Sequence, residues 1–411
     1  MKTYKIASFP VVFAALGYFV DMYDLLLFSI VRESSLAGVG VSLLNKEAVV
    51  AASAFVINWQ MLGLLLGGIL WGIMGDKKGR LSVLLGSITL YSIATFASAF
   101  VHTLDQYALA RFISGIGLAG ELGAGITLIS EILPKNKRGL GTTLVASLGV
   151  LGTTAAYLTF KLTQDWRLCY KIGGVLGVLL LFLRFSVFES GLFEKTKTTQ
   201  AIRGNFWMFF TNRLRFKKYI TAVLIGMPIW YMVGILINFS NRFAKEFYPN
   251  SAVESGKAIM LSYVFGALGG LLIGHISQYF KSRKKAYTLY LLIGVIGIFL
   301  YFSNWNHSDE RMYFICSLIG FSNGIWALLA TIWAEQFGTN IRATAATSIP
   351  NMVRATLPLM NLLFVDLFQH QWHWDLIKSG YITGWVIMLL SFVAFYHVEE
   401  TYDKDLDYIE H

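Results

Sequence analysis

Residues 48–74 read AVVAASAFVINWQMLGLLLGGILWGIM, and the basic turn GDKKGR follows at 75–80. The apolar stretch contains no charged side chain. A bilayer core of about 30 Å requires about 20 mostly apolar residues in a helix. The stretch therefore predicts a helix that crosses a membrane and ends in a basic loop.

The composition of the whole chain points the same way. Of 411 residues, 55% are hydrophobic and only 14% are charged, whereas soluble domains carry about a quarter charged residues. The net charge of +10 lies in short clusters between apolar runs, which is typical of membrane topology signals and gives no reason to expect nucleic acid as a partner. Cys169 and Cys316 lie in different apolar segments without metal-ligand spacing, so we expect no metal site.

We expect an all-α membrane protein of twelve transmembrane helices in two six-helix bundles. The N-terminal apolar run continues past the length of a signal peptide and is interpreted as an uncleaved first span. The predicted domains are an N-terminal bundle at 1–190, an amphipathic linker on the cytoplasmic surface at 191–218, and a C-terminal bundle with a short acidic tail at 219–411. The predicted spans lie near 9–31, 48–74, 81–101, 105–133, 139–161, 168–188, 219–241, 258–280, 286–303, 311–333, 343–368 and 377–397.

Lys and Arg give an independent test of this layout. Most of them fall in the loops on the same side as the two termini, and only Arg111, Arg184 and Arg354 fall inside predicted spans. Because basic loops stay in the cytoplasm, both termini are expected there, in a bacterial-type inner membrane.

The two halves also share sequence landmarks. Gly72 and Asp76 follow the second span, and Gly274 and Gln278 follow the eighth, 202 residues later. A second landmark, a Glu and an Arg seven residues apart, occurs after spans four and ten with an offset of 204 residues, as Glu131 with Arg138 and Glu335 with Arg342. Two landmarks at nearly one offset indicate an internal repeat, which is common in transporters.

These residues resemble the major facilitator superfamily. The stretch from Gly72 to Arg80 is similar to the family's loop motif between helices two and three. The stretch Glu131-x-x-Pro134-x-x-x-Arg138-Gly139 resembles the signature of sugar porters and metabolite:H+ symporters. The motif-level likeness is strongest in the first half, where Arg111-x-x-x-Gly115-x-Gly117-x-x-Gly120-Glu121-x-Gly123 and Asp21-Met-Tyr-Asp24 resemble metabolite:H+ symporters. Gln278 and Gly338 depart from the family pattern in the second half.

Ionisable side chains inside a bilayer are costly and are therefore functional candidates. Asp21 and Asp24 share one face of the first span, where two carboxylates can take up and release a proton. Glu121 lies in the middle of span four and is the third candidate for proton coupling. The alternatives are a structural pair locked to an arginine, a gate at Asp24, and a structural hydrogen bond at Glu121.

The predicted substrate-binding residues begin with two arginines. Arg111 is a natural partner for Asp21 or Asp24, and Arg354 in span eleven follows Asn351 by one turn. An arginine that faces a cavity can bind a carboxylate through two hydrogen bonds, but it can also form an inter-helix salt bridge. Further polar or aromatic candidates, each with a structural alternative, are Asn58, Gln60, Asn238, Asn323 and Trp326. The other aromatic residues are expected to face lipid or the membrane interface.

The family resemblance implies a set of gating residues in the cytoplasmic loops. There, charge networks hold one conformation and their rupture permits rocking between states. The alternative role is topology signalling alone. The candidates are Asp76, Arg80, Glu131, Arg138, Glu335 and Arg342.

Taken together, the sequence predicts a proton-coupled symporter of a small polar or anionic organic solute, with a tilt toward carboxylates. A uniporter, an exchanger or an exporter of the same fold is the alternative, and a membrane sensor is a second class. Phosphate-binding loops, nucleophile elbows and metal-spaced clusters are missing from the sequence, so we expect no enzyme and no cofactor. The expected partners are the substrate, protons and the lipid bilayer, and the expected state is a monomer.

Overall fold

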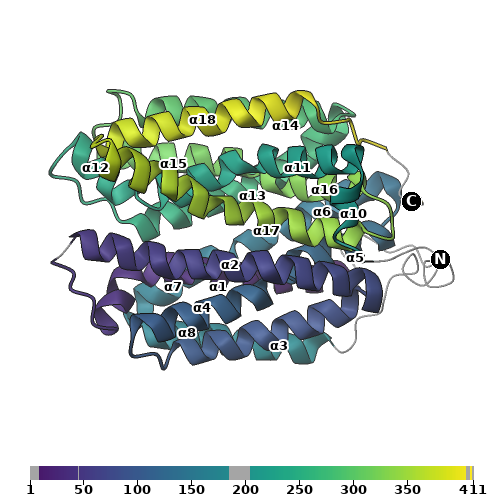
Figure 1. Ribbon diagram of the computed structural model, residues 1–411, viewed down its shortest axis with the longest axis horizontal. Coiled ribbons are helices and arrows are strands. Elements are labelled where there is room, and N and C mark those ends of the chain that lie inside the picture. The colour runs from purple at the N-terminus through teal and green to yellow at the C-terminus, as the bar shows by residue number, and fades with distance from the viewer. Residues whose placement is uncertain (1–8, 45, 185–203, 404–407, 410–411) are drawn as a thin grey trace.

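A computed structural model describes residues 9–44, 46–184, 204–403 and 408–409 as two helical bundles (Figure 1). The first bundle contains the six spans of the N-terminal half. Two of these spans are each divided into two helices by a local break. The helices are α1 (Phe9–Gly38), α2 (Lys46–Lys78), α3 (Arg80–Ser98), α4 (Leu104–Leu118) with α5 (Glu121–Ile132), α6 (Lys135–Val150) with α7 (Gly152–Thr163), and α8 (Trp166–Arg184).

The second bundle repeats this arrangement in the C-terminal half. Two short helices, α10 (Met208–Thr211) and α12 (Ser240–Phe247), lie outside the spans. The spans are α11 (Arg213–Tyr231) with the π-helix η1 (Met232–Ile237), α13 (Ser255–Tyr279), α14 (Arg283–Tyr301), α15 (Asp309–Asn323) with α16 (Ile325–Gln336), α17 (Arg342–Asn361) with the π-helix η2 (Leu362–Gln371), and α18 (Leu376–Tyr396).

Eleven of these spans are long and apolar enough to cross a membrane by length and composition. The remaining one is the helical run of α17 and η2, which carries Arg342, Arg354 and two prolines, Pro350 and Pro358. Its lower hydropathy follows from those residues and not from a shorter helix. The predicted fold of twelve transmembrane helices in two bundles is confirmed.

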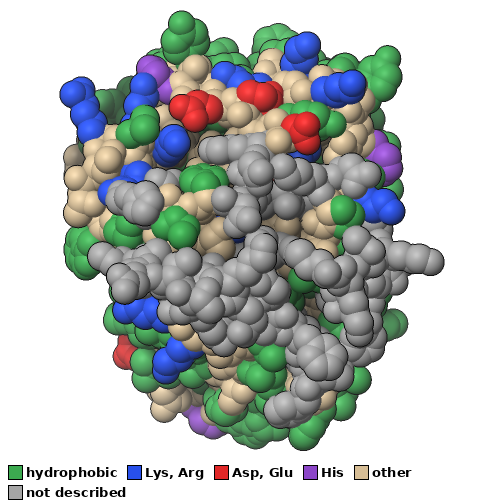
Figure 2. Space-filling model, turned by 90° about the vertical axis from the view of Figure 1, so that its right-hand side faces the viewer, with side chains coloured by type: hydrophobic (Ala, Val, Ile, Leu, Met, Phe, Trp, Pro, Cys, Tyr) green, Lys and Arg blue, Asp and Glu red, His purple; other side chains and the backbone are tan. Residues whose placement is uncertain are grey.

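The span at α11 begins at Arg213, earlier than the predicted 219. Asn212 explains the difference, because its side chain accepts hydrogen bonds from the backbone N–H groups of Leu214 and Arg215 and so caps the helix. Part of the predicted linker therefore belongs to a helix, and its residues 191–203 lie outside the described part of the chain. Lys and Arg side chains lie around the end of the molecule that carries α10 (Figure 2).

The two bundles meet along two equivalent helix pairs, α2 with α17 and α6 with α13. At one pair, a Cβ on Gly72 would lie 2.9 Å from the Cα of Thr344. At the other, a Cβ on Gly274 would lie 2.5 Å from the Oγ1 of Thr143. The glycines that define the sequence repeat thus lie at close contacts between the two halves.

The repeat also places two helix breaks at equivalent positions. The break between α4 and α5 falls at Gly120, and the break between α15 and α16 falls at Gly324, 204 residues later. Interrupted helices in corresponding positions of two halves mark the binding region in many transporters. Gly324 and its neighbour Trp326 do line a cavity.

Candidate functional site

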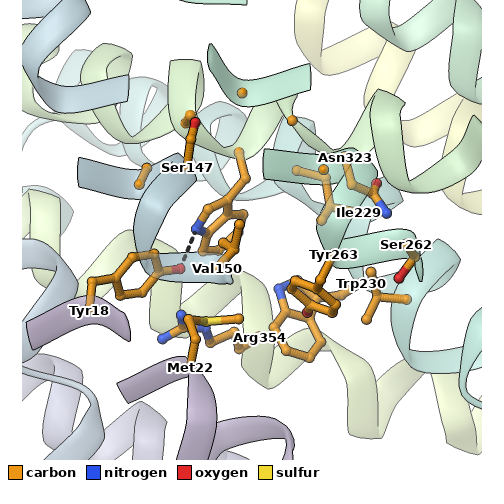
Figure 3. Close-up of a pocket in the computed structure, with 17 residues that line it drawn as sticks. Tyr18, Met22, Ser147, Val150, Ile229, Trp230, Ser262, Tyr263, Asn323 and Arg354 are labelled. Atoms are coloured by element: carbon orange, nitrogen blue, oxygen red, sulfur yellow. Dashed lines mark hydrogen bonds between the residues drawn. The ribbon is translucent and has the colours of Figure 1, made fainter. Parts of the chain in front are cut away.

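A cavity of about 560 Å³ lies between the two bundles. Tyr18 and Met22 of α1 approach it from one side, and Trp230 and Tyr263 from the opposite side (Figure 3). Among the described lining residues, Arg354 of α17 is the one charged side chain.

Arg354 is positioned by its own helix and by an aromatic ring. Its Nη1 donates a hydrogen bond of 2.8 Å to the Oδ1 of Asn351, and its guanidinium lies 5.4 Å from the ring centroid of Trp326. Asn351 is in turn fixed, because its Nδ2 donates to the backbone oxygens of Ala119 and Thr347. Asn351 therefore holds the arginine and does not itself line the cavity.

The guanidinium of Arg354 retains unused hydrogen-bonding capacity. Its Nε is buried and has no hydrogen-bond partner in the described structure, and no carboxylate of a described residue pairs with it within salt-bridge distance. An unpaired buried charge is costly, so such a group is expected to meet its partner from outside the protein. The geometry suits an anion that enters the cavity.

Three further cavity residues carry polar atoms without a partner among the described residues. These are the indole Nε1 of Trp230, the side-chain amide of Asn323 and the Oγ of Ser147. The set is dominated by hydrogen-bond donors and contains no carboxylate. Because donors and a cation bind anions while aromatic walls bind flat apolar surfaces, the cavity can hold a small anion with a planar body.

Tyr18 links the two halves at the edge of this cavity. Its hydroxyl accepts a hydrogen bond of 3.1 Å from the Nε1 of Trp326, which is the dashed contact in Figure 3. Arg354 and Asp21 both lie within electrostatic range of this hydroxyl. Asp21 follows Tyr18 by one turn of α1 and is fully buried, but it does not line the cavity.

Asp24 and Arg111 form a separate buried cluster inside the N-terminal bundle. The Nη1 of Arg111 lies 2.8 Å from the Oδ1 of Asp24, and its Nη2 donates to the Asp24 backbone oxygen. Thr95 and Ser114 each donate a hydrogen bond of 2.6 Å to the Oδ2 of Asp24. Arg111 therefore lies with Asp24 and not at the cavity, and both side chains are almost completely buried.

Gln60 and Asn238 lie together in a second hollow of about 400 Å³. This hollow shares Trp230 and Val233 with the cavity. The Nε2 of Gln60 donates to the backbone oxygen of Leu25. Both residues thus lie beside the cavity and not in it.

Other predicted residues lie elsewhere. Asn58 and Glu121 do not line either hollow among the described residues. Glu121 is buried at the start of α5, directly after the break at Gly120. The break recurs at Gly324 in the second half. The role of Glu121 in proton transfer stays a prediction.

The predicted gating residue Asp76 bridges the halves. Its carboxylate accepts hydrogen bonds from the backbone N–H groups of Ala343 and Thr344, at 3.1 and 2.8 Å, and from the Thr344 hydroxyl at 2.6 Å. It therefore caps the start of α17, where Arg342 is the first residue and is fully buried. The side chains of Arg80, Glu131 and Arg138 lie outside the described part of the structure.

In the second half, Glu335, the counterpart of Glu131 in the repeat, pairs with Arg283 at 3.0 Å. The C-terminal tail joins this pair through Thr401, whose Oγ1 donates to the Oε2 of Glu335. The neighbouring Glu400 caps the start of α14. Burial alone would raise the pKa of the Glu400 carboxyl, but hydrogen bonds from the Ser282 hydroxyl and from backbone N–H groups, including that of Arg283, hold it below its ordinary value.

Apart from Trp326, the sequence prediction missed the aromatic lining of the cavity, because the other aromatic residues were expected to face lipid or the membrane interface. Tyr18, Trp230 and Tyr263 line the cavity instead. Tyr18 could have been recognised, because it precedes Asp21 by three residues and so shares its helix face. No comparable signal marks Trp230 or Tyr263 in a chain with 11 Trp and 20 Tyr residues.

Comparisons with known proteins agree with this architecture. The family model of the major facilitator superfamily matches residues 14–358. The chain is 29% identical to a putative metabolite transport protein of Haemophilus influenzae, covering 83% of this chain and 84% of that protein. It is 28% identical to the niacin transporter NiaP of Acinetobacter baylyi, over 72% and 74% of the two chains. It is 26% identical to the cis,cis-muconate transport protein of the same organism, over 86% and 84%.

Among solved structures, the fold is similar to the proton:xylose symporter XylE bound to 6-bromo-6-deoxy-D-glucose. The TM-score is 0.77 at 17% identity, and the match covers 97% of both chains. At this identity the likeness establishes the fold alone.

Proposed function

Since the chain belongs to the major facilitator superfamily, whose members found here are transporters of metabolites and not enzymes, we propose that it is a proton-coupled symporter of a small organic carboxylate. The proposed location is a bacterial-type inner membrane with both termini in the cytoplasm, supported by the distribution of Lys and Arg. Inward transport with protons would use alternating access of the two bundles.

The observation that carries the proposal is Arg354 in the cavity. It is a buried cation with an unused Nε, held in place by Asn351 and stacked near Trp326. A guanidinium held in this way is preorganised to bind a carboxylate through charge-assisted hydrogen bonds. The relatives named for niacin and muconate transport support a substrate of this class, with an unsaturated planar body between Trp230 and Tyr263.

The proposed proton site is Asp24, with Asp21 and Glu121 as further candidates. Its carboxylate is enclosed by Arg111, Thr95 and Ser114. Protonation would remove the charge that holds Arg111, so the local packing of α1, α3 and α4 would change with proton occupancy. A buried ion pair that is broken from one side is strongly destabilised, which makes this cluster a suitable two-state element.

The second part of the proposed mechanism is the set of contacts that closes the cavity toward the inner end of the molecule. Asp76 fixes α2 to the start of α17, and the glycines of both helix pairs permit close contact. Rocking of the bundles would have to separate these contacts to open the cavity to the inside. Glu335 and Arg342 lie at the same end and belong to the same proposed gate.

The first test is uptake by purified protein in proteoliposomes, with acid outside, of labelled nicotinate, benzoate and cis,cis-muconate, and of xylose as an uncharged control. We expect carboxylate uptake and no xylose uptake. Arg354→Gln should raise the KM by about 10- to 100-fold, because charge-assisted hydrogen bonds are worth about 1.5–3 kcal/mol. Arg311→Gln, a change at a half-buried arginine near Trp305 that does not line the cavity, is the matched control. Uptake of xylose, or an unchanged KM in Arg354→Gln, would reject the carboxylate site.

The second test separates a symporter from a uniporter. Asp24→Asn should abolish stimulation by the pH gradient while carboxylate exchange across the membrane persists. Asp105→Asn, at an exposed helix start, is the control with the same change of charge. If the wild-type protein takes up carboxylates equally with and without the gradient, proton coupling is wrong and facilitated transport is the correct reading.

A further inference from the structure

A second group of cationic side chains lies near the C-terminal end of α1. Arg32 is 5% exposed, and its guanidinium lies 5.6 Å from the ring centroid of Phe239. Arg242 of α12 lies 6.0 Å from the centroid of the same ring and is half-buried. Arg32 and Arg242 come from opposite bundles and meet at one aromatic ring; we call them the outer arginine pair.

Arg32 differs from the other buried arginines whose partners are described. Arg111 is paired with Asp24, and Arg283 is paired with Glu335. The guanidinium of Arg32 has no salt bridge among the described residues, and its Nε and Nη1 are buried without a hydrogen-bond partner there. The guanidinium of Arg354 likewise has a buried Nε without a hydrogen-bond partner and no salt bridge among the described residues. Arg32 therefore shares with the cavity arginine an unused hydrogen-bonding capacity.

Polar atoms near Arg32 are also without partners. The side-chain oxygens of Asn238, Ser240 and Asn241, on either side of Phe239 in the sequence, are buried without a partner among the described residues. Glu33 is an acid within electrostatic range of both arginines, and its side chain is exposed. Buried polar groups normally have partners, so this cluster is built to hold water or a ligand.

The cluster borders the route to the cavity. Ser29, one turn before Arg32 on α1, and Asn238, next to Phe239, both line the smaller hollow. That hollow shares Trp230 and Val233 with the cavity that contains Arg354. An anion that leaves the outer arginine pair therefore meets the hollow next and Arg354 after it.

We propose that Arg32 and Arg242 form an outer carboxylate-binding site that captures the substrate before it reaches Arg354. The inference rests on the proposed function, because it takes the transported solute to be an organic carboxylate. Binding here would be a charge-assisted contact between the carboxylate oxygens and the guanidinium of Arg32, with the Ser240 hydroxyl as a further donor. The two arginines would raise the local concentration of anions at the mouth of the route.

The test is the concentration dependence of nicotinate uptake in proteoliposomes at low ionic strength, in wild type and in Arg32→Gln, Arg32→Lys and Arg242→Gln. We expect about a tenfold higher KM in Arg32→Gln, with Vmax changed by less than about twofold. Arg32→Lys, which keeps the charge, should recover a large part of the affinity. Arg311→Gln, which changes a half-buried arginine 5.0 Å from the ring centroid of Trp305, should behave as wild type.

The outcomes separate the two proposals. If wild-type protein takes up no carboxylate, the proposed function fails and the outer site fails with it. If wild-type uptake is normal and the KM of both Arg32→Gln and Arg242→Gln equals that of Arg311→Gln, the outer site alone is overturned. If Arg32→Gln does not fold, as judged by size-exclusion chromatography, the less buried Arg242→Gln decides, because an unchanged KM in that variant overturns the site. A fall in Vmax at unchanged KM, which a structural role would cause, also overturns it.

Discussion

Asp76→Asn should weaken the inner closure between α2 and α17 by a measurable amount. The carboxylate of Asp76 is 1% exposed and accepts three hydrogen bonds from α17, two of them from the backbone at its start. An asparagine retains one acceptor oxygen, and its amide N–H₂ would point at a donor. The change removes at least one hydrogen bond to a charged group, worth about 1.5–3 kcal/mol. It also removes a negative charge from a helix start, worth about 0.3–1 kcal/mol.

The net loss is therefore about 2–4 kcal/mol, which shifts the balance between closed and open inner ends by about 30- to 700-fold. The shift can be measured by pulsed electron paramagnetic resonance with spin labels at Lys78 of α2 and Lys285 of α14, exposed positions on opposite bundles. Asp76→Asn should add or enlarge a long-distance population. Asp105→Asn, at the exposed start of α4, should not. A distance distribution for Asp76→Asn identical to that of wild type would refute the role assigned to these hydrogen bonds.

Two further predictions concern the same end of the molecule. Gly72→Ala should also favour the open inner end, because its Cβ would lie 2.9 Å from the Cα of Thr344, and overpacking costs about 1–3 kcal/mol. Gly125→Ala, whose Cβ would meet its nearest neighbour at 3.7 Å, should leave the spin-label distances unchanged. The tail contact of Glu400 should depend on pH: because its pKa is held below the ordinary 4.5, its stabilisation is complete above that value and is lost as the pH falls through the lowered pKa. A spin label at Asp403 should become mobile in that range, and in Glu400→Gln it should be mobile at neutral pH as well; a label whose mobility is independent of pH in wild type contradicts the prediction.

The fold was predictable because it depends on quantities that a sequence records directly. Lengths of apolar runs give the spans, and the offsets of 202 and 204 residues give the equivalence of the halves. The structure places the landmarks of the repeat at equivalent points, with Gly72 against Thr344 and Gly274 against Thr143. A glycine at these positions leaves room for the neighbouring helix to come this close.

The site was predictable only in part. Arg354, Asn323 and Trp326 reach the cavity, and Asn351 supports Arg354 from behind. Arg111 was a candidate both for binding substrate and for pairing with Asp24, and its contact is with Asp24. Sequence spacing shows which residues share a helix face, but the direction of that face depends on how each helix is rotated against its neighbours. That rotation also decides which of many aromatic residues line the cavity.

The arrangement of charges constrains how proton and substrate can be coupled. The proposed proton site belongs to the N-terminal bundle, where Asp24 and Arg111 meet, whereas Arg354 belongs to the C-terminal bundle. Occupancy of one site can therefore influence the other only through contacts that cross between the bundles. The hydrogen bond from Trp326 to Tyr18 is such a contact, and Tyr18 lies on the same helix as Asp24, about 9 Å away along its axis. Because α1 also carries Arg32, one rigid helix connects the outer arginine pair, the proton site and the cavity wall. A displacement of α1 that follows protonation of Asp24 would move Tyr18 against Trp326 and Arg354, and this gives the coupling a physical path.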